Sequence, residues 1–97
     1  MTLGAVAGIV GGRLADADAE TIVSGPVEFD SRRAVAGGLF LALPGEHVDG
    51  HDFTADAVRA GALACLVTRP VDSPRIEVTD GLDALTALAT VAARQCG

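Results

Sequence analysis

Leu39-Phe40-Leu41-Ala42-Leu43 is an almost wholly apolar run between two turn signals, Gly37-Gly38 and Pro44-Gly45. A short apolar run bounded in this way predicts a strand that is buried on both faces of a sheet. A second apolar run, Leu63 to Val67, predicts another buried strand, and the stretch from Phe53 to about Ala60 predicts a helix between the two. This order predicts a parallel pair of strands joined by a right-handed crossover.

Shorter elements flank this unit. We expect a helix from Thr2 that ends at Gly11-Gly12, and a last helix that begins after Asp80. Asp52 is the expected cap of the middle helix. Further short strands are predicted at Arg13–Ala15, Thr21–Val23, Val27–Phe29 and Arg75–Val78. The expected inner face of the last helix consists of Leu82, Leu85, Leu88, Ala89, Val91 and Ala92. The predicted fold is a small α/β domain in which helices flank a mixed sheet.

The composition supports a packed core made of small side chains. The chain has 97 residues, 49% of them apolar, with three Phe and neither Trp nor Tyr. We therefore expect residues 1–97 to form one domain. Cys65 lies in an apolar run and is expected to be a buried thiol, and its distance from Cys96 matches no metal or redox motif. The N-terminus lacks a basic segment and no run is long enough to span a membrane, so a cytoplasmic location is expected.

The charge excludes two classes of function. The net charge is −6 and the chain has no lysine, so non-specific nucleic-acid binding, which needs clustered Lys and Arg, is not expected. A phosphate loop of the nucleoside-triphosphatase type requires a lysine, which excludes ATP hydrolysis by that route. An anionic ligand would need arginine, backbone N–H groups or a helix N-terminus.

The first candidate site is the segment Phe29-Asp30-Ser31-Arg32, where a strand ends and a turn begins. Ser31 offers a hydroxyl group, and Arg32 offers a planar fork of donors that suits phosphate or carboxylate. The alternative is a simple turn in which Asp30 caps local N–H groups and the arginines are solvated.

The second candidate site is the loop from Glu46 to Asp52, which holds both histidines and three acidic residues. It could bind a metal, although its spacing matches no established metal motif. It could provide acid–base catalysis through a His–Asp pair, although no nucleophile accompanies it. It could also be a polar recognition loop that Gly50 allows to turn.

These segments resemble the N-terminal domain of the Mur ligases, the ATP-dependent enzymes that add amino acids to the peptidoglycan precursor. The resemblance rests on Asp30-Ser31-Arg32, on the block from Gly37 to Gly45, on Asp49-Gly50-His51-Asp52-Phe53 and on the passage from Ala57 through Gly61 into a strand. The block from Phe40 to Phe53 is most similar to the MurF branch, the UDP-N-acetylmuramoyl-tripeptide:D-alanyl-D-alanine ligases. The MurE branch, which adds the preceding residue, is the second choice.

The resemblance implies a role for each candidate residue. Phe29, Ser31 and Arg32 would line a site for the UDP end of the precursor, and Glu46, His47 and Val48 would form its second wall. Asp30, Asp49, Gly50 and His51 would shape the loops. No residue of this chain would be catalytic or bind metal.

The resemblance also implies the wider function. The full ligase would use ATP and Mg, would act in peptidoglycan and cell-wall synthesis, and would thereby affect cell shape and division. Its partners would be the UDP-N-acetylmuramoyl-peptide and its own central and C-terminal domains, so this chain alone is expected to be inactive. Two alternatives remain: an interaction module without a small ligand, and a small metallohydrolase built on the two histidines.

Overall fold

The computed structural model describes residues 1–43 and 49–96, and the side chains of residues 1–43 and 49–91. It contains a five-stranded sheet in the order β1-β5-β4-β3-β2. The strands are β1 (Arg13–Ala15), β2 (Val27–Glu28), β3 (Leu39–Leu41), β4 (Ala64–Val67) and β5 (Arg75–Glu77). β1 runs antiparallel to β5, and the other neighbours are parallel. The predicted mixed sheet is therefore confirmed.

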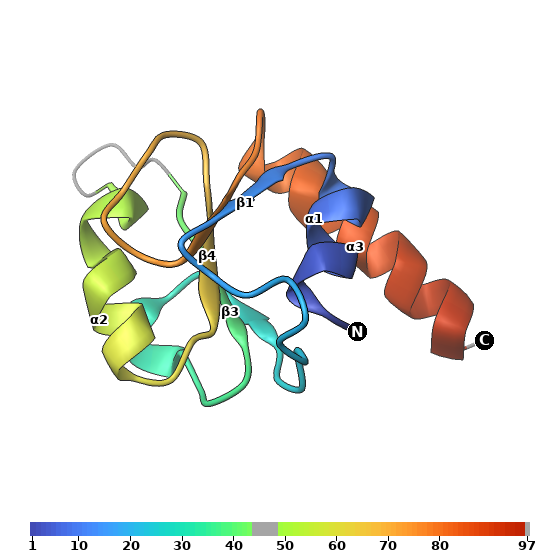
Figure 1. The fold of residues 1–97 in the computed structure, drawn as a ribbon, viewed down its shortest axis with the longest axis horizontal. Helices are drawn as coiled ribbons and strands as arrows, with labels where there is room; N and C mark the ends of the chain where they lie inside the picture. The colour runs from blue at the N-terminus through green and yellow to red at the C-terminus, as the bar shows by residue number, and fades with distance from the viewer. Residues whose placement is uncertain (44–48, 97) are drawn as a thin grey trace.

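Helices cover both faces of this sheet. Figure 1 shows α1 (Leu3–Val10) and α3 (Gly81–Cys96) on one side and α2 (Thr54–Arg59) on the other. There are two 3₁₀ turns: η1 (Ser31–Arg33) follows β2, and η2 (Gly50–Phe53) directly precedes α2. Within the described part of the chain, no helix is both long and apolar enough to cross a lipid bilayer.

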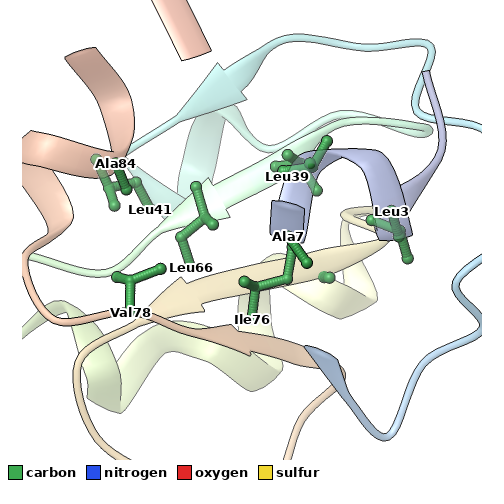
Figure 2. Close-up of a cluster of buried hydrophobic side chains, with 10 residues drawn as sticks. Leu3, Ala7, Leu39, Leu41, Leu66, Ile76, Val78 and Ala84 are labelled. Atoms are coloured by element: carbon green, nitrogen blue, oxygen red, sulfur yellow. The ribbon is translucent and has the colours of Figure 1, made fainter. Parts of the chain in front are cut away.

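The core has two parts because successive residues of β3 and β4 point to opposite faces of the sheet. Leu39 and Leu41 of β3 pack with Leu66 of β4 in the cluster beneath α1 and α3, which Figure 2 shows. Phe40 and Cys65 belong to the cluster beneath α2. All residues of β3 and β4 are buried, which confirms the predicted pair of strands with two covered faces. They pair in parallel, as predicted.

Local signals set most helix ends where the sequence predicted them. The Thr2 side chain accepts a hydrogen bond from the Ala5 N–H at 3.1 Å, and Gly11 ends α1 with a φ of 65°. Gly61 follows α2 with a φ of 117°, a backbone conformation that side chains disfavour. Asp80 caps α3 by accepting from the Leu82 N–H at 2.8 Å.

Two expectations about local structure were wrong. Thr21–Val23 forms no strand but one isolated bridge, from Ile22 to Thr2, because only the short segment before α1 lies beside it. Asp52 caps no helix, because the η2 turn, capped by Asp49, precedes α2.

The inner face of α3 is rotated relative to the prediction. Leu82 is 61% exposed and Ala89 is exposed, whereas Ala84, Leu85 and Leu88 pack against the sheet. The Leu periodicity placed Leu85 and Leu88 correctly and Leu82 wrongly, and the Ala92 side chain lies outside the described residues.

Cys65 is fully buried, as predicted, and burial raises the pKa of its thiol to about 12. A thiol in this state is a small apolar group of the core and a poor nucleophile.

We predict that Leu66→Ala lowers the free energy of unfolding by about 3 kcal/mol, because it opens a cavity in the middle of the sheet. Leu82→Ala removes the same atoms from an exposed position and should change that free energy by less than about 0.5 kcal/mol. Urea denaturation followed by far-UV circular dichroism measures both. Equal losses for the two variants would contradict the described packing of α3.

Candidate functional site

An open pocket of about 710 Å³ lies at the carboxyl ends of β2 and β3, beside the start of α2. Loops that follow parallel strands meet at this edge, where ligands of α/β proteins commonly bind. The residues that line it are Phe29, Asp30, Ser31, Arg32, Phe40, Leu43, Gly50, Phe53 and Asp56. Since all three phenylalanines of the chain are among them, we call it the phenylalanine pocket.

The three rings differ in exposure. Phe40 extends from β3 and is 1% exposed, Phe53 at the end of η2 is half-buried, and Phe29 after β2 is 66% exposed. An exposed ring beside a pocket offers a flat apolar surface on which a planar ligand group, such as a nucleobase, can stack. The sequence analysis named Phe29 as a site residue but missed Phe40 and Phe53, because it assigned them to a buried strand and the start of a helix.

The Asp30–Arg32 segment forms a tight polar turn at one side of the pocket. Asp30 accepts hydrogen bonds from the Arg32 backbone N–H at 3.0 Å and from Nε and Nη2 of the same residue at 3.0 and 2.9 Å. The side chain of Arg32, followed by its backbone N–H, holds the pKa of the Asp30 carboxyl at about 2. A guanidinium has five N–H groups, and Asp30 engages two of them, so donors remain for an anionic ligand. Asp30 thus caps the local N–H groups, as expected for a simple turn. The pocket beside this turn is the additional observation that points to a ligand site.

Asp49 and His51, which flank the lining residue Gly50, hold the start of η2 in place. Asp49 accepts from the His51 backbone N–H at 3.0 Å, and its Oδ1 lies 2.7 Å from His51 Nδ1. Its Oδ2 accepts from Arg69 at 2.9 Å. The backbone N–H of His51, followed by the side chains of Arg69 and His51, holds the pKa of the Asp49 carboxyl well below its usual range.

The His51 ring is buried and both of its nitrogens have partners. Its side chain is 2% exposed, and Nε2 accepts from the Thr68 backbone N–H at 3.0 Å. This arrangement leaves the ring without a free nitrogen for a substrate, which weighs against the His–Asp pair as an acid–base catalyst. Among the residues that the structure describes, no group of three or more His, Cys, Asp or Glu side chains could hold a metal ion.

Gly50 lies between Asp49 and His51 and approaches the residues that follow β3 closely. Its N–H donates to the Leu43 carbonyl at 2.8 Å, and a Cβ atom at this position would lie 2.7 Å from the Leu43 nitrogen. Only glycine fits such an approach, so the requirement for Gly50 is one of space.

The structure brings Phe29, Asp30, Ser31, Arg32 and Gly50 together around one pocket. Asp49 and His51 flank Gly50 in the chain and do not line the pocket. The other three predicted site residues, Glu46, His47 and Val48, lie outside the described residues.

Sequence reasoning missed Asp56, Thr68 and Arg69. Asp56 lines the pocket from the first turn of α2 and forms an ion pair with Arg59 at 2.6 Å. Thr68 and Arg69 directly follow β4. The rule that loops after parallel strands converge on one edge could have placed them near His51.

We predict that acid destabilises the fold through Asp30 and Asp49. Their native pKa values are below the unfolded ones, so the stability that each contributes is present above about pH 4 and is lost as the pH falls through the native pKa. Asp49→Asn keeps an N-cap side chain but not the charge, so its deficit in unfolding free energy should shrink below about pH 4.

Urea denaturation between about pH 7 and pH 2 measures this difference. Leu82→Ala, at an exposed position of α3 and without a titratable group, is the control and should give a difference that does not change with pH. A pH-independent deficit for Asp49→Asn would show that its carboxylate does not titrate as described.

Sequence comparison relates this chain to known proteins. Residues 26–93 match the family described as Mur ligase family, catalytic domain. The UDP-N-acetylmuramoyl-tripeptide--D-alanyl-D-alanine ligase of Mycobacterium leprae is 54% identical over 82 residues, which cover 80% of this chain and 16% of that ligase. The UDP-N-acetylmuramoyl-L-alanyl-D-glutamate--2,6-diaminopimelate ligase of Geobacillus kaustophilus is 48% identical over 65 residues, 65% of this chain and 13% of that ligase.

Solved structures give the same result. A crystal structure of MurF from Acinetobacter baumannii superposes with a TM-score of 0.77 at 31% identity, over 90% of this chain and 20% of that one. The MurF ligase from Thermotoga maritima, solved in complex with ADP, gives a TM-score of 0.63 at 33% identity, over 69% of this chain and 16% of that one.

The chain thus spans about 16% of the length of the D-alanyl-D-alanine ligase that it matches in Mycobacterium leprae. The similarity to the MurF branch covers more of the chain than that to the diaminopimelate-adding branch, which confirms the order of the two predicted resemblances. Because its residues 26–93 match this family, the chain belongs to the Mur ligase family.

Proposed function

We propose that this chain binds the UDP end of the UDP-N-acetylmuramoyl-peptide precursor in the phenylalanine pocket, as the substrate-recognition domain of a MurF-like ligase. The observation that carries the proposal is the composition of that pocket. Phe29 offers a stacking surface, and Ser31 and Arg32 offer a hydroxyl and a cationic fork on the same side. A nucleoside diphosphate presents the complementary groups, a flat base and a diphosphate.

The charge of the chain makes this local arrangement important. With a net charge of −6, the chain as a whole repels an anion, so a diphosphate must be held by particular donors. Arg32 is suited to this task because Asp30 orients its guanidinium without using all its donors. Ser31 begins the η1 turn and adds a hydroxyl group beside it.

In the proposed ligase, this domain acts through position and not through chemistry. Binding energy from the nucleotide end would hold the distant peptide carboxylate where it can be activated and joined to D-alanyl-D-alanine. ATP and Mg would serve that step in other parts of a longer ligase, in line with the relative from Thermotoga maritima solved with ADP. We place the whole reaction in cytoplasmic peptidoglycan synthesis, with the UDP-precursor and the other ligase domains as partners.

We predict that Arg32→Ala weakens UDP binding about 10- to 100-fold, because it removes charge-assisted hydrogen bonds. Ser31→Ala should weaken it about 3- to 10-fold, through loss of one neutral hydrogen bond. NMR titration of the ¹⁵N-labelled chain with UDP, then with UDP-N-acetylmuramoyl-tripeptide, measures the dissociation constants and locates the site.

Arg33→Ala is the matched control, because Arg33 is in the same turn and has the same charge but does not line the pocket. It should change the affinity less than about twofold. Equal losses for Arg32→Ala and Arg33→Ala would indicate general attraction of an anion and would contradict a specific site. Absence of any shift at millimolar UDP, both here and in a full-length ligase that contains this domain, would favour an interaction module.

A further inference from the structure

One wall of the phenylalanine pocket is connected by hydrogen bonds to residues after β4, which do not line the pocket. Gly50 forms part of that wall, whereas Thr68 and Arg69 follow β4. Hydrogen bonds connect the two regions: His51 Nε2 accepts from the Thr68 N–H and lies 3.3 Å from the Thr68 hydroxyl, and Asp49 Oδ2 accepts from Arg69. We call the set of Asp49, His51, Thr68 and Arg69 the latch.

The latch fixes the tautomer of His51. The Thr68 backbone N–H can only donate, so Nε2 must be the unprotonated nitrogen that accepts. The proton of the neutral ring is then on Nδ1, which donates to Asp49 Oδ1 at 2.7 Å. The low pKa of the Asp49 carboxyl keeps this acceptor ionised at neutral pH. A neutral ring in this tautomer satisfies both contacts at once.

The latch is joined to the pocket wall through the chain itself. Gly50 stands between the two latch residues Asp49 and His51, and its N–H donates to Leu43, another lining residue. The His51 ring is buried, so a change of partners would leave a buried ring nitrogen without a hydrogen bond. The contact of His51 with Thr68, the residue after β4, therefore restrains the position of Gly50 together with the bond from Gly50 to Leu43.

We propose that His51 is a positioning residue for the UDP site: through its Nε2 contact with Thr68 it holds the Gly50 wall at the separation from Ser31 and Arg32 that the ligand requires. The part of this proposal that concerns UDP affinity rests on the proposed function. Its structural half, the latch itself, can be measured without any ligand.

Two amide variants separate the two contacts of the ring. In His51→Gln the side-chain oxygen can reach the place of Nε2 and accept from the Thr68 N–H. In His51→Asn the shorter amide can donate to Asp49 but cannot reach Thr68. The first variant thus keeps the bond to β4, and the second keeps only the bond within the loop.

Without ligand, native-state hydrogen exchange reports on the latch. We expect protection of the Thr68 and Gly50 amides in the wild-type chain and in His51→Gln. We expect at least a tenfold loss of protection at both amides in His51→Asn, with the amides of β3 unchanged. Nitrogen chemical shifts of the wild-type ring should identify Nδ1 as the protonated nitrogen.

With UDP, His51→Asn should bind at least tenfold more weakly than His51→Gln, which should stay within about threefold of wild type. Melting temperatures of the two variants serve to separate positioning from general destabilisation. The proposal is overturned if both folded variants bind UDP equally, if their affinities merely follow their melting temperatures, or if Thr68 exchanges equally in both. Failure of the wild-type chain to bind UDP would instead refute the proposed function, while the exchange result would still decide on the latch.

Discussion

The parallel pairing of β3 with β4, with both faces covered, is the constraint on which the rest of the molecule depends. Since every residue of the two strands is buried, their register cannot shift without moving apolar side chains from one core cluster to the other. Parallel strands also end at the same edge. The η1 turn after β2, Leu43 after β3 and the residues after β4 therefore meet there, and this edge holds both the phenylalanine pocket and the latch.

Most of the core consists of aliphatic side chains, and all three phenylalanine rings line the pocket. Leu, Val, Ile and Ala form the cluster beneath α1 and α3, which contains no aromatic ring. Phe40 serves both purposes, because its ring belongs to the cluster beneath α2 and also lines the pocket. The floor of the pocket is thus continuous with the core, and a ligand there would rest on a surface that cannot easily deform.

Much of this fold follows from the sequence because its strongest signals are local. The apolar runs at Leu39 and Leu63, the cap at Thr2 and the glycine at position 61 each act over a few residues, and each was placed correctly. The errors arose where distant contacts decide the outcome. Leu82 matches the periodicity of α3 but faces solvent, because the way α3 packs on the sheet favours Ala84. Likewise, the turn at Asp30 follows from its side chain, whereas the bond from Thr68 to His51 joins residues 17 positions apart and has no local signal.

The concentration of phenylalanine around one pocket also has a spectroscopic consequence. The chain has no tryptophan or tyrosine, so its near-ultraviolet aromatic signal comes from Phe29, Phe40 and Phe53. Phenyl ring currents in its proton spectrum likewise originate from these three side chains. Methyl groups shifted by those rings are therefore natural reporters of the pocket, and they require no added label to report on it.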